Sequence, residues 1–415
     1  MSEPLYRSRP GEPCPARLGI QQVNDFTYLS EGFSNCFMFT TGEGRIIVNT
    51  GMGFEAPIHK QNFDSISTDP IRYIILTQGH TDHVGGVDYY REPGTQVIAQ
   101  AGNTEHQAYD ARLGRFRADR SAFAFRDKLV DAVHYVKQEV GAVPPQARPV
   151  PDITFEDKLE LELGGLRLEV LGIPGAETND SLIVWLPEHR ICLPGNLFGC
   201  LFGHFPNLVT IRGDRYRDAL TVARAVERVM ELDVEHLLLG HHAPIHGSAL
   251  IREELERLLG AIHHVHDATV EGMNEGVDVH TLMQEITLPP ELEVGEGYGK
   301  ISWSVRAIWE HYAGWFHHES TTELYSVPRR AVHEDLIDLA GGPAALVERA
   351  KVRFEAGESE QALHLLDVVL SQEETDRAAL ELCIEIHRRL ASESVNFWLS
   401  AWLEREIEKL SERLA

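Results

Sequence analysis

The stretch ILTQGHTDHVGG, residues 75–86, places three candidate metal ligands immediately after an apolar segment. His80, Asp82 and His83 follow one another so closely that their side chains can face metal ions from a single tight loop. Imidazole and carboxylate groups suit zinc and other divalent first-row metals. Taken alone, the pattern is equally compatible with a capped turn. The preceding strand, the closing glycine pair and further candidate ligands downstream favour a metal site.

Apolar strands alternate with helices in the first part of the chain. We expect strands within residues 34–51, 71–78, 95–100, 159–175, 181–187, 190–196 and 235–242. We expect helices over residues 103–140 and 214–231, and throughout the sequence after residue 248. Candidate ligands follow the ends of several strands, at 78–83, 177–181, 196 and 241–242. Polar side chains in such loops are typical of an α/β sandwich that carries its chemistry there.

The composition disfavours several classes of partner. A formal charge of −26, from 64 acidic and 38 basic residues, argues against nucleic acids and anionic membranes, which require clustered lysine and arginine. No apolar run has the length of a membrane span, and the N-terminus lacks the apolar region of a secretory signal. The 5 cysteines form no CxxC pair, which indicates reduced thiols. We therefore expect a cytoplasmic protein that acts on a small-molecule substrate.

Three segments resemble the metallo-β-lactamase superfamily. ILTQGHTDHVGG resembles its metal-binding loop, HxHxDH, with His80, Asp82 and His83 as the last three ligands. IIVNTG resembles the strand before that loop, with Asn49 in place of the usual aspartate. LLLGHHAP resembles the late Gly-His element of the superfamily, and this resemblance implies that His241 is a metal ligand.

Other segments resemble the alkylsulfatase branch of that superfamily. PGAETNDS resembles the segment in which a glutamate fills the third-ligand position, and Glu177 falls there. PNLVTIRGDRYRDAL resembles the segment with the sulfate-binding arginine, which corresponds to Arg212. Residues 298–316 and 339–370 resemble the helical dimerisation domain of the branch.

The resemblance implies a domain order. We expect an αββα sandwich over residues 1–250, with a helical insertion at about 103–145, and a mainly α-helical dimerisation domain over 251–415. The expected assembly is a homodimer or larger oligomer, and a hetero-oligomer is an alternative. Long-chain alkylsulfatases continue into a lipid-carrier-like domain, whereas this sequence ends at Ala415. We therefore expect a smaller substrate.

The sequence departs from the superfamily pattern at two ligand positions. Gln78 replaces a histidine, and Asn196 stands where a metal-bridging carboxylate is expected. By resemblance, one cation would use Gln78, His80 and Glu177, and the other would use Asp82, His83 and His241. Neutral amides are poorer ligands for divalent metals, so we predict tight binding at the second position and weak or selective binding at the first. The alternative is that Gln78 coordinates through oxygen and both positions fill with zinc.

These residues predict a metal-dependent hydrolase that uses a metal-activated water on a small sulfate ester or another activated ester or ether. Asp82 is expected to orient or deprotonate that water, in addition to binding metal. Arg212 is expected to clamp an anionic group, with an ion pair to Asp214 or Asp218 as the alternative. Zinc is the expected cofactor, as one or two ions, with manganese or iron as alternatives.

Two further questions stay open in the sequence. The lost charge at Gln78 and Asn196 is also compatible with a weakened, metal-poor partner subunit of a hetero-oligomeric hydrolase. In addition, several aromatic side chains are candidates either for an apolar substrate pocket or for ordinary core packing. They are Phe198, Phe202, Phe205, Trp303 and Trp309.

Overall fold

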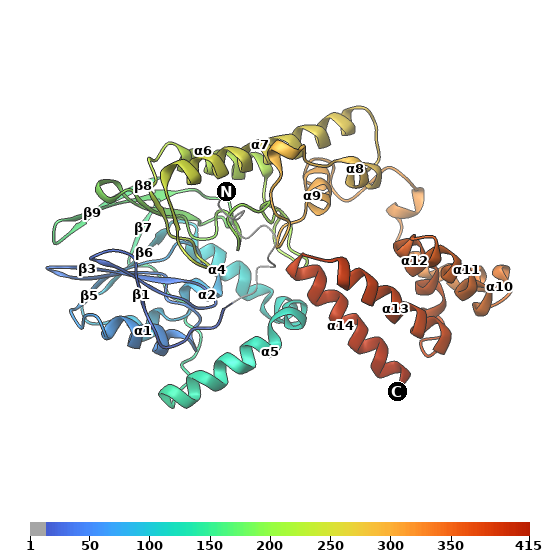
Figure 1. The fold of residues 1–415 in the computed structure, drawn as a ribbon, viewed down its shortest axis with the longest axis horizontal. Coiled ribbons are helices and arrows are strands. Elements are labelled where there is room, and N and C mark those ends of the chain that lie inside the picture. The colour runs from blue at the N-terminus through green and yellow to red at the C-terminus, as the bar shows by residue number, and fades with distance from the viewer. Residues whose placement is uncertain (1–13) are drawn as a thin grey trace. The chain divides into compact units, whose positions relative to one another are not determined.

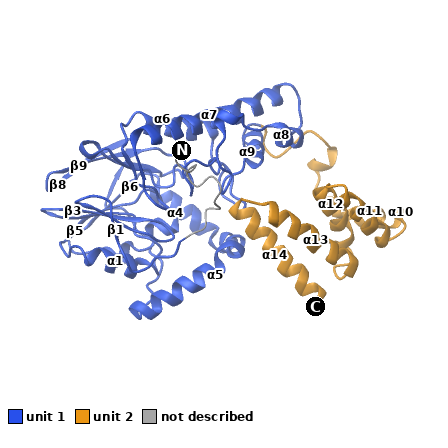
Figure 2. Ribbon diagram, viewed as in Figure 1, with its two compact units in different colours: residues 1–312 blue, residues 313–415 orange. Residues whose placement is uncertain are grey.

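A computed structural model describes residues 14–415, which form two compact units that divide between Tyr312 and Ala313 (Figure 2). The domain boundary that we predicted near residue 250 coincides with the start of helix α7 (Ser248–Asn274), inside the first unit. It stays a prediction. Each unit is described here by itself.

Two β-sheets build the centre of the first unit (Figure 1). The first sheet holds, in spatial order, β1 (Gln21–Gln22), β2 (Thr27–Ser30), β3 (Cys36–Thr41), β4 (Gly44–Val48), β5 (Ile71–Ile75), β6 (Gln96–Gln100) and β7 (Ile153–Phe155). The second holds β13 (Ile245–His246), β12 (His236–Leu237), β11 (Ile191–Leu193), β10 (Leu182–Leu186), β9 (Leu166–Gly172) and β8 (Lys158–Leu163). Strands β4 to β7 pair in parallel, and most other neighbours pair antiparallel.

Alternating side chains give each sheet two buried faces. On strand β3, Phe37 and Phe39 belong to the core between the sheets, together with Leu182 and Val184 of the second sheet. The intervening Met38 packs in a different cluster, on the outer face of the first sheet. Burial of both faces explains why these strands read as continuous apolar runs in the sequence.

Helices cover the outer faces and complete an αββα arrangement (Figure 1). Helices α1 (Ala56–Asp64) and α3 (Val87–Tyr90) contribute to the outer cluster of the first sheet. Helices α6 (Ala219–Met230) and α7 pack with the second sheet. The sequence predicted helix α6 from residue 214. It begins at 219, because the Asp218 side chain accepts a hydrogen bond from the Thr221 backbone N–H and caps the first turn.

The expected helical insertion contains two helices, α4 (Asn103–Arg112) and α5 (Gly114–Val140). Helix α5 is 27 residues long, yet only Ala132 and Val136 are fully buried, both in its C-terminal half. Shorter elements complete the unit: α2 (Thr81–Val84), α8 (Val279–Glu285), α9 (Ile301–Ala313), η1 (Pro187–His189) and η2 (Pro290–Leu292).

The second unit is helical throughout and has its own apolar cluster. It contains η3 (Thr321–Leu324), η4 (Arg329–Val332), α10 (His333–Ala340), α11 (Pro343–Glu355), α12 (Ser359–Leu370), α13 (Arg377–Glu393) and α14 (Phe397–Leu414). This agrees with the helical C-terminal part that the sequence predicted. Over residues 14–415, no helix combines the length and the apolar character that crossing a membrane requires.

Candidate metal centre

The predicted site residues gather around one cavity of about 600 Å³ in the first unit. Six of them line it directly: His80, Asp82, Glu177, Asn196, Arg212 and His241. The other two, Gln78 and His83, are buried behind this lining, with exposed fractions of 1% and 0%. The loops after strands β5, β9, β11 and β12 therefore converge on this cavity.

Asp82, His83 and His241 form the most compact group. One ligand atom from each lies within 4.8 Å of the others, and within residues 14–415 no other trio of His, Cys, Asp or Glu is grouped so closely. The Asp82 Oδ2 atom lies 3.6 Å from His83 Nε2 and 3.8 Å from His241 Nε2. The buried His83 Nε2 atom has no hydrogen-bond partner among these described residues. One carboxylate and two imidazoles with an unpaired nitrogen fit a divalent metal ion.

Buried polar contacts prepare His83 for this role. The Thr77 hydroxyl donates to Asn49 Oδ1 at 3.0 Å. Thr77 Oγ1 can therefore only accept from His83 Nδ1, which lies 3.4 Å away. With its proton on Nδ1, His83 presents the lone pair of Nε2 to the group. Burial lowers the pKa of His83, and it lowers that of His241 to about 4. Both rings are therefore neutral at pH 7, as metal ligation requires.

Gln78 and His80 form a different arrangement. The Asn196 backbone N–H donates to Gln78 Oε1 at 3.1 Å, so the amide nitrogen of Gln78 faces His80 Nδ1 at 2.6 Å. His80 Nε2 and Asn196 Oδ1 are buried, and neither has a hydrogen-bond partner in the part of the chain that the structure describes. Desolvation, followed by the charges of His106, Arg212 and Arg217, holds the pKa of His80 well below its usual range.

Glu177 is paired with an arginine that the sequence reasoning missed. Arg217 Nη2 donates to Glu177 Oε1 at 2.9 Å, and its Nε donates to the Glu177 carbonyl oxygen at 2.7 Å. Burial raises the pKa of Glu177 to about 7, against the opposing charge of Arg217. The signal was available, because Arg217 lies in the segment that resembles the sulfate-binding region.

Arg212 lies half-buried on the cavity wall, and its guanidinium forms no ion pair within residues 14–415. The alternative partners are engaged elsewhere: Asp214 with Arg117, and Asp218 with Arg224 and His311. Helix α5 holds the Arg212 loop, since Arg120 donates to the carbonyl oxygens of Ile211 and Arg212. The neighbouring Thr210 also lines the cavity, and its buried hydroxyl has no hydrogen-bond partner within the described part of the chain.

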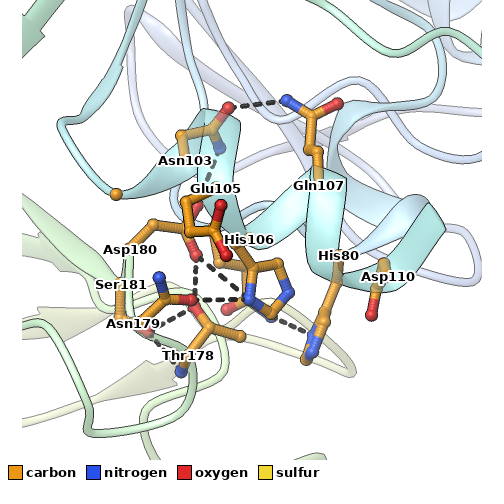
Figure 3. A network of polar contacts seen from close by, with 12 residues as sticks. His80, Asn103, Glu105, His106, Gln107, Asp110, Thr178, Asn179, Asp180 and Ser181 are labelled. Carbon is orange, nitrogen blue, oxygen red and sulfur yellow. Dashed lines mark hydrogen bonds and ion pairs between the residues drawn. The ribbon is translucent and has the colours of Figure 1, made fainter. Parts of the chain in front are cut away.

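A polar network supports the site from behind (Figure 3). The Asp180 carboxylate accepts from Asn103 Nδ2 at 2.7 Å and from the Thr178 hydroxyl at 2.6 Å. His106 contacts Asn179 Oδ1 at 2.8 Å, and its ring centroid lies 5.3 Å from that of His80. Figure 3 shows that these side chains join helix α4 to the loop after Glu177. The network thus fixes the loop that carries Glu177 against the loop that carries His80.

The apolar part of the cavity is not formed by the aromatic residues that we considered. Phe198, Phe202, Phe205 and Trp309 are buried in the core cluster of the second sheet, and Trp303 does not line the cavity. Helix α5 forms the wall instead, through small and apolar side chains at helical spacing. These include Gly114, Ala118, Ser121, Ala122, Phe125 and Leu129. Tyr298 also lines the cavity and was missed, although it lies in a segment quoted for the resemblance.

With this geometry in hand, the comparison with known proteins defines the class. The chain belongs to the metallo-β-lactamase superfamily, whose family model matches residues 29–241. Residues 278–411 match the alkyl sulfatase dimerisation model. These matches confirm the predicted fold class and its hydrolase character, and they imply a divalent metal cofactor.

Particular relatives are alkylsulfatases. A linear primary-alkylsulfatase from Pseudomonas sp. is 27% identical over 392 residues, which cover 89% of this chain and 73% of the relative. An alkyl/aryl-sulfatase from Saccharomyces cerevisiae is 24% identical, covering 94% of this chain and 64% of the relative. The solved structure of a stereoselective inverting sec-alkylsulfatase from Pseudomonas sp. shares the fold with a TM-score of 0.82 at 19% identity, covering 96% of this chain and 66% of that one. The chain thus spans about two thirds of the length of the last two relatives.

Proposed function

We propose that this protein is a metal-dependent hydrolase that cleaves sulfate esters of small apolar alcohols. The observation that carries the proposal is the group of Asp82, His83 and His241, set beside Arg212 in one cavity. Asp82, His83 and His241 would hold one divalent cation, with zinc the expected ion. The names of the relatives support a sulfate ester as the substrate. We also propose a homodimer, on the strength of the dimerisation match at 278–411.

A divalent metal ion in such a site supplies Lewis-acid activation of water at neutral pH. The protein's own residues provide the remaining functions. Arg212, which lines the cavity and forms no ion pair within residues 14–415, would present a planar set of donors to the sulfate oxygens. The unpaired Thr210 hydroxyl adds a donor on the same wall. Because Arg212 is half-buried and Thr210 is buried, these contacts are stronger there than at a fully exposed surface.

The wall formed by helix α5 supports an apolar organic group on the substrate. Besides Arg117 and Arg126, its lining side chains include small residues, with Ala118 and Ala122 spaced one helical turn apart. Small residues leave room for a hydrocarbon group beside the helix, and Phe125 and Leu129 continue the apolar surface. A cavity of about 600 Å³ is of the size that binds small organic ligands.

The test is a hydrolysis panel on metal-loaded protein. We expect release of inorganic sulfate from short and medium alkyl sulfates, and little turnover of matched phosphate esters, carboxylic esters, lactams or activated aryl ethers. His83→Ala should abolish the activity and the tightly held metal together. Sulfate release by His83→Ala at the wild-type rate would contradict the proposal. An inactive, metal-free wild-type protein would favour the metal-poor partner subunit that the sequence left open.

A further inference from the structure

We infer that the half of the site formed by Gln78, His80 and Glu177 holds no cation, and that His80 instead donates its Nε2–H to the anionic group of the substrate. The inference rests on the proposed function for the identity of that anion. It replaces a predicted second metal position with an anion-binding position built from side chains alone.

The first step is the orientation of the Gln78 amide. Its oxygen accepts from the Asn196 backbone N–H at 3.1 Å, and a backbone N–H can only donate. The nitrogen of the amide must therefore face His80 Nδ1, at 2.6 Å. An amide nitrogen donates and does not accept, so Nδ1 of His80 carries the lone pair. In the neutral ring the proton is then on Nε2, which cannot coordinate a metal in that state.

His83 provides the internal comparison. The Thr77 hydroxyl commits its proton to Asn49 and offers its oxygen to His83 Nδ1, which leaves a lone pair on Nε2. The two histidines of one loop are thus prepared for opposite roles: His83 presents an acceptor and His80 presents a donor. Both Nε2 atoms are buried and have no hydrogen-bond partner among residues 14–415, so each is left for a ligand of its own kind.

The surroundings of His80 also disfavour a cation. Arg217 occupies the Glu177 carboxylate through a contact of 2.9 Å, with exposed side-chain fractions of 5% and 10% for the two partners. Arg217 thereby neutralises the one carboxylate of this half of the site and uses its donors within the protein. Arg212 and Arg217 line the same cavity as His80. Arg212, which forms no ion pair within residues 14–415, supplies the remaining positive charge, so this position favours an anion over a dication. The Arg212 guanidinium and the His80 N–H are complementary to a tetrahedral oxyanion.

The first test determines which nitrogen of the His80 ring carries the proton, in metal-loaded protein labelled with ¹⁵N-histidine. Long-range ¹⁵N–¹H correlation spectra, with the His80 signals assigned by their loss in His80→Ala, should show protonated Nε2 and unprotonated Nδ1. The Glu side chain in Gln78→Glu has nearly the same shape but accepts where Gln78 donates. This variant should therefore carry the His80 proton on Nδ1 and leave Nε2 unprotonated. A wild-type His80 protonated on Nδ1 would overturn the inference.

The second test counts metal ions and measures anion binding. Wild-type protein should retain one equivalent after exhaustive dialysis, His80→Ala should also retain one, and His83→Ala should retain none. Gln78→Glu should gain a second equivalent, whereas Ser121→Glu, which adds the same charge elsewhere on the cavity wall, should not. His80→Ala should weaken the binding of hexane-1-sulfonate, measured by calorimetry, by about ten- to a hundredfold.

These outcomes separate the two proposals. Two equivalents in the wild type, or the loss of one equivalent in His80→Ala, would overturn this inference and leave the hydrolase proposal standing. A wild type that holds one equivalent and binds the sulfonate, but hydrolyses no sulfate ester, would contradict the proposed function and leave this inference standing.

Discussion

At the scale of single residues, the departures from the family pattern carry more information than the matches. The sequence predicted Asp82, His83 and His241 as ligands from short motifs, and the structure brings these three side chains together. It predicted Gln78 as a weakened ligand, because an amide is a poor one. It did not reveal the direction of the Gln78 amide. That direction depends on the Asn196 backbone N–H, which lies 118 positions away in the chain.

A buried carboxyl group gives a prediction about pH and stability. Glu55 is 0% exposed, and its Oε1 accepts from the backbone N–H groups of Ala16 and Phe33, at 2.8 and 3.2 Å. Burial nevertheless raises its pKa from 4.5 to about 7. A folded-state pKa above the unfolded value means that stability is fully present below pH 4.5 and is lost as the pH rises through about 7.

We therefore expect Glu55 to cost on the order of 3 kcal/mol of unfolding free energy at pH 8 relative to low pH. Glu55→Gln cannot ionise, so its stability should fall less than that of the wild type between pH 5.5 and 8.5. Urea unfolding across this range measures the difference. Exposed Glu139→Gln is the control, and its unfolding free energy should change with pH as that of the wild type does. If the unfolding free energies of the wild type and Glu55→Gln change equally with pH, the Glu55 carboxyl group is ionised over the whole range.

At the scale of elements, helix α5 (114–140) has a function that its sequence did not disclose. Its periodicity predicted a helix correctly, and its small residues gave no indication of a cavity wall. The reason is physical: whether Ala118 or Ala122 packs against protein or lines a cavity depends on the loops opposite, which periodicity does not describe. The same helix holds the loop of Arg212 through Arg120.

Loss of the Arg120 contacts should affect substrate binding. Arg120→Ala removes two hydrogen bonds to the backbone of the Arg212 loop, so we expect KM for a short alkyl sulfate to rise by about tenfold. Metal content should not change, because Arg120 touches none of the three ligands. Arg115→Ala, an exposed arginine on the same helix, is the matched control and should leave KM near the wild-type value. An unchanged KM in Arg120→Ala would show that the loop holds its position without helix α5.

Filling the apolar wall should change substrate preference. Ala122→Phe places a ring in the cavity beside helix α5, so kcat/KM for octyl sulfate should fall by roughly tenfold or more relative to that for ethyl sulfate. Asp119→Phe adds the same ring at an exposed position of the helix that does not line the cavity. It should leave the ratio of the two kcat/KM values unchanged. A constant ratio in Ala122→Phe would place the hydrocarbon group elsewhere.

At the scale of the whole molecule, the sequence predicted the order of architectures well. Apolar runs and polar loops indicated the sandwich, and helix-like segments without strands after residue 248 indicated the helical region. The boundary between the two compact units was not apparent in the sequence, because it follows Tyr312, in the last turn of helix α9 (301–313). No change in composition marks that position.

The second unit exposes large apolar side chains that a dimer would bury. Tyr325 and Leu339 are 70% and 84% exposed in the single chain. Sedimentation equilibrium should give a mass of about twice 46.6 kDa for the wild type. Combining Tyr325→Glu with Leu339→Glu should shift the protein toward the monomer. Val150→Glu, at a position 71% exposed in the first unit, should not. A monomeric wild type would contradict the proposed homodimer.

The central claim is that one divalent cation, bound by Asp82, His83 and His241, serves a site whose other half binds the anion. Its most direct test is a crystal structure of the zinc-loaded protein, with anomalous difference density recorded at the zinc absorption edge. We predict one strong peak within coordination distance of these three side chains, and none next to His80 and Glu177. Two peaks of comparable height, or a single peak at His80, would contradict the account.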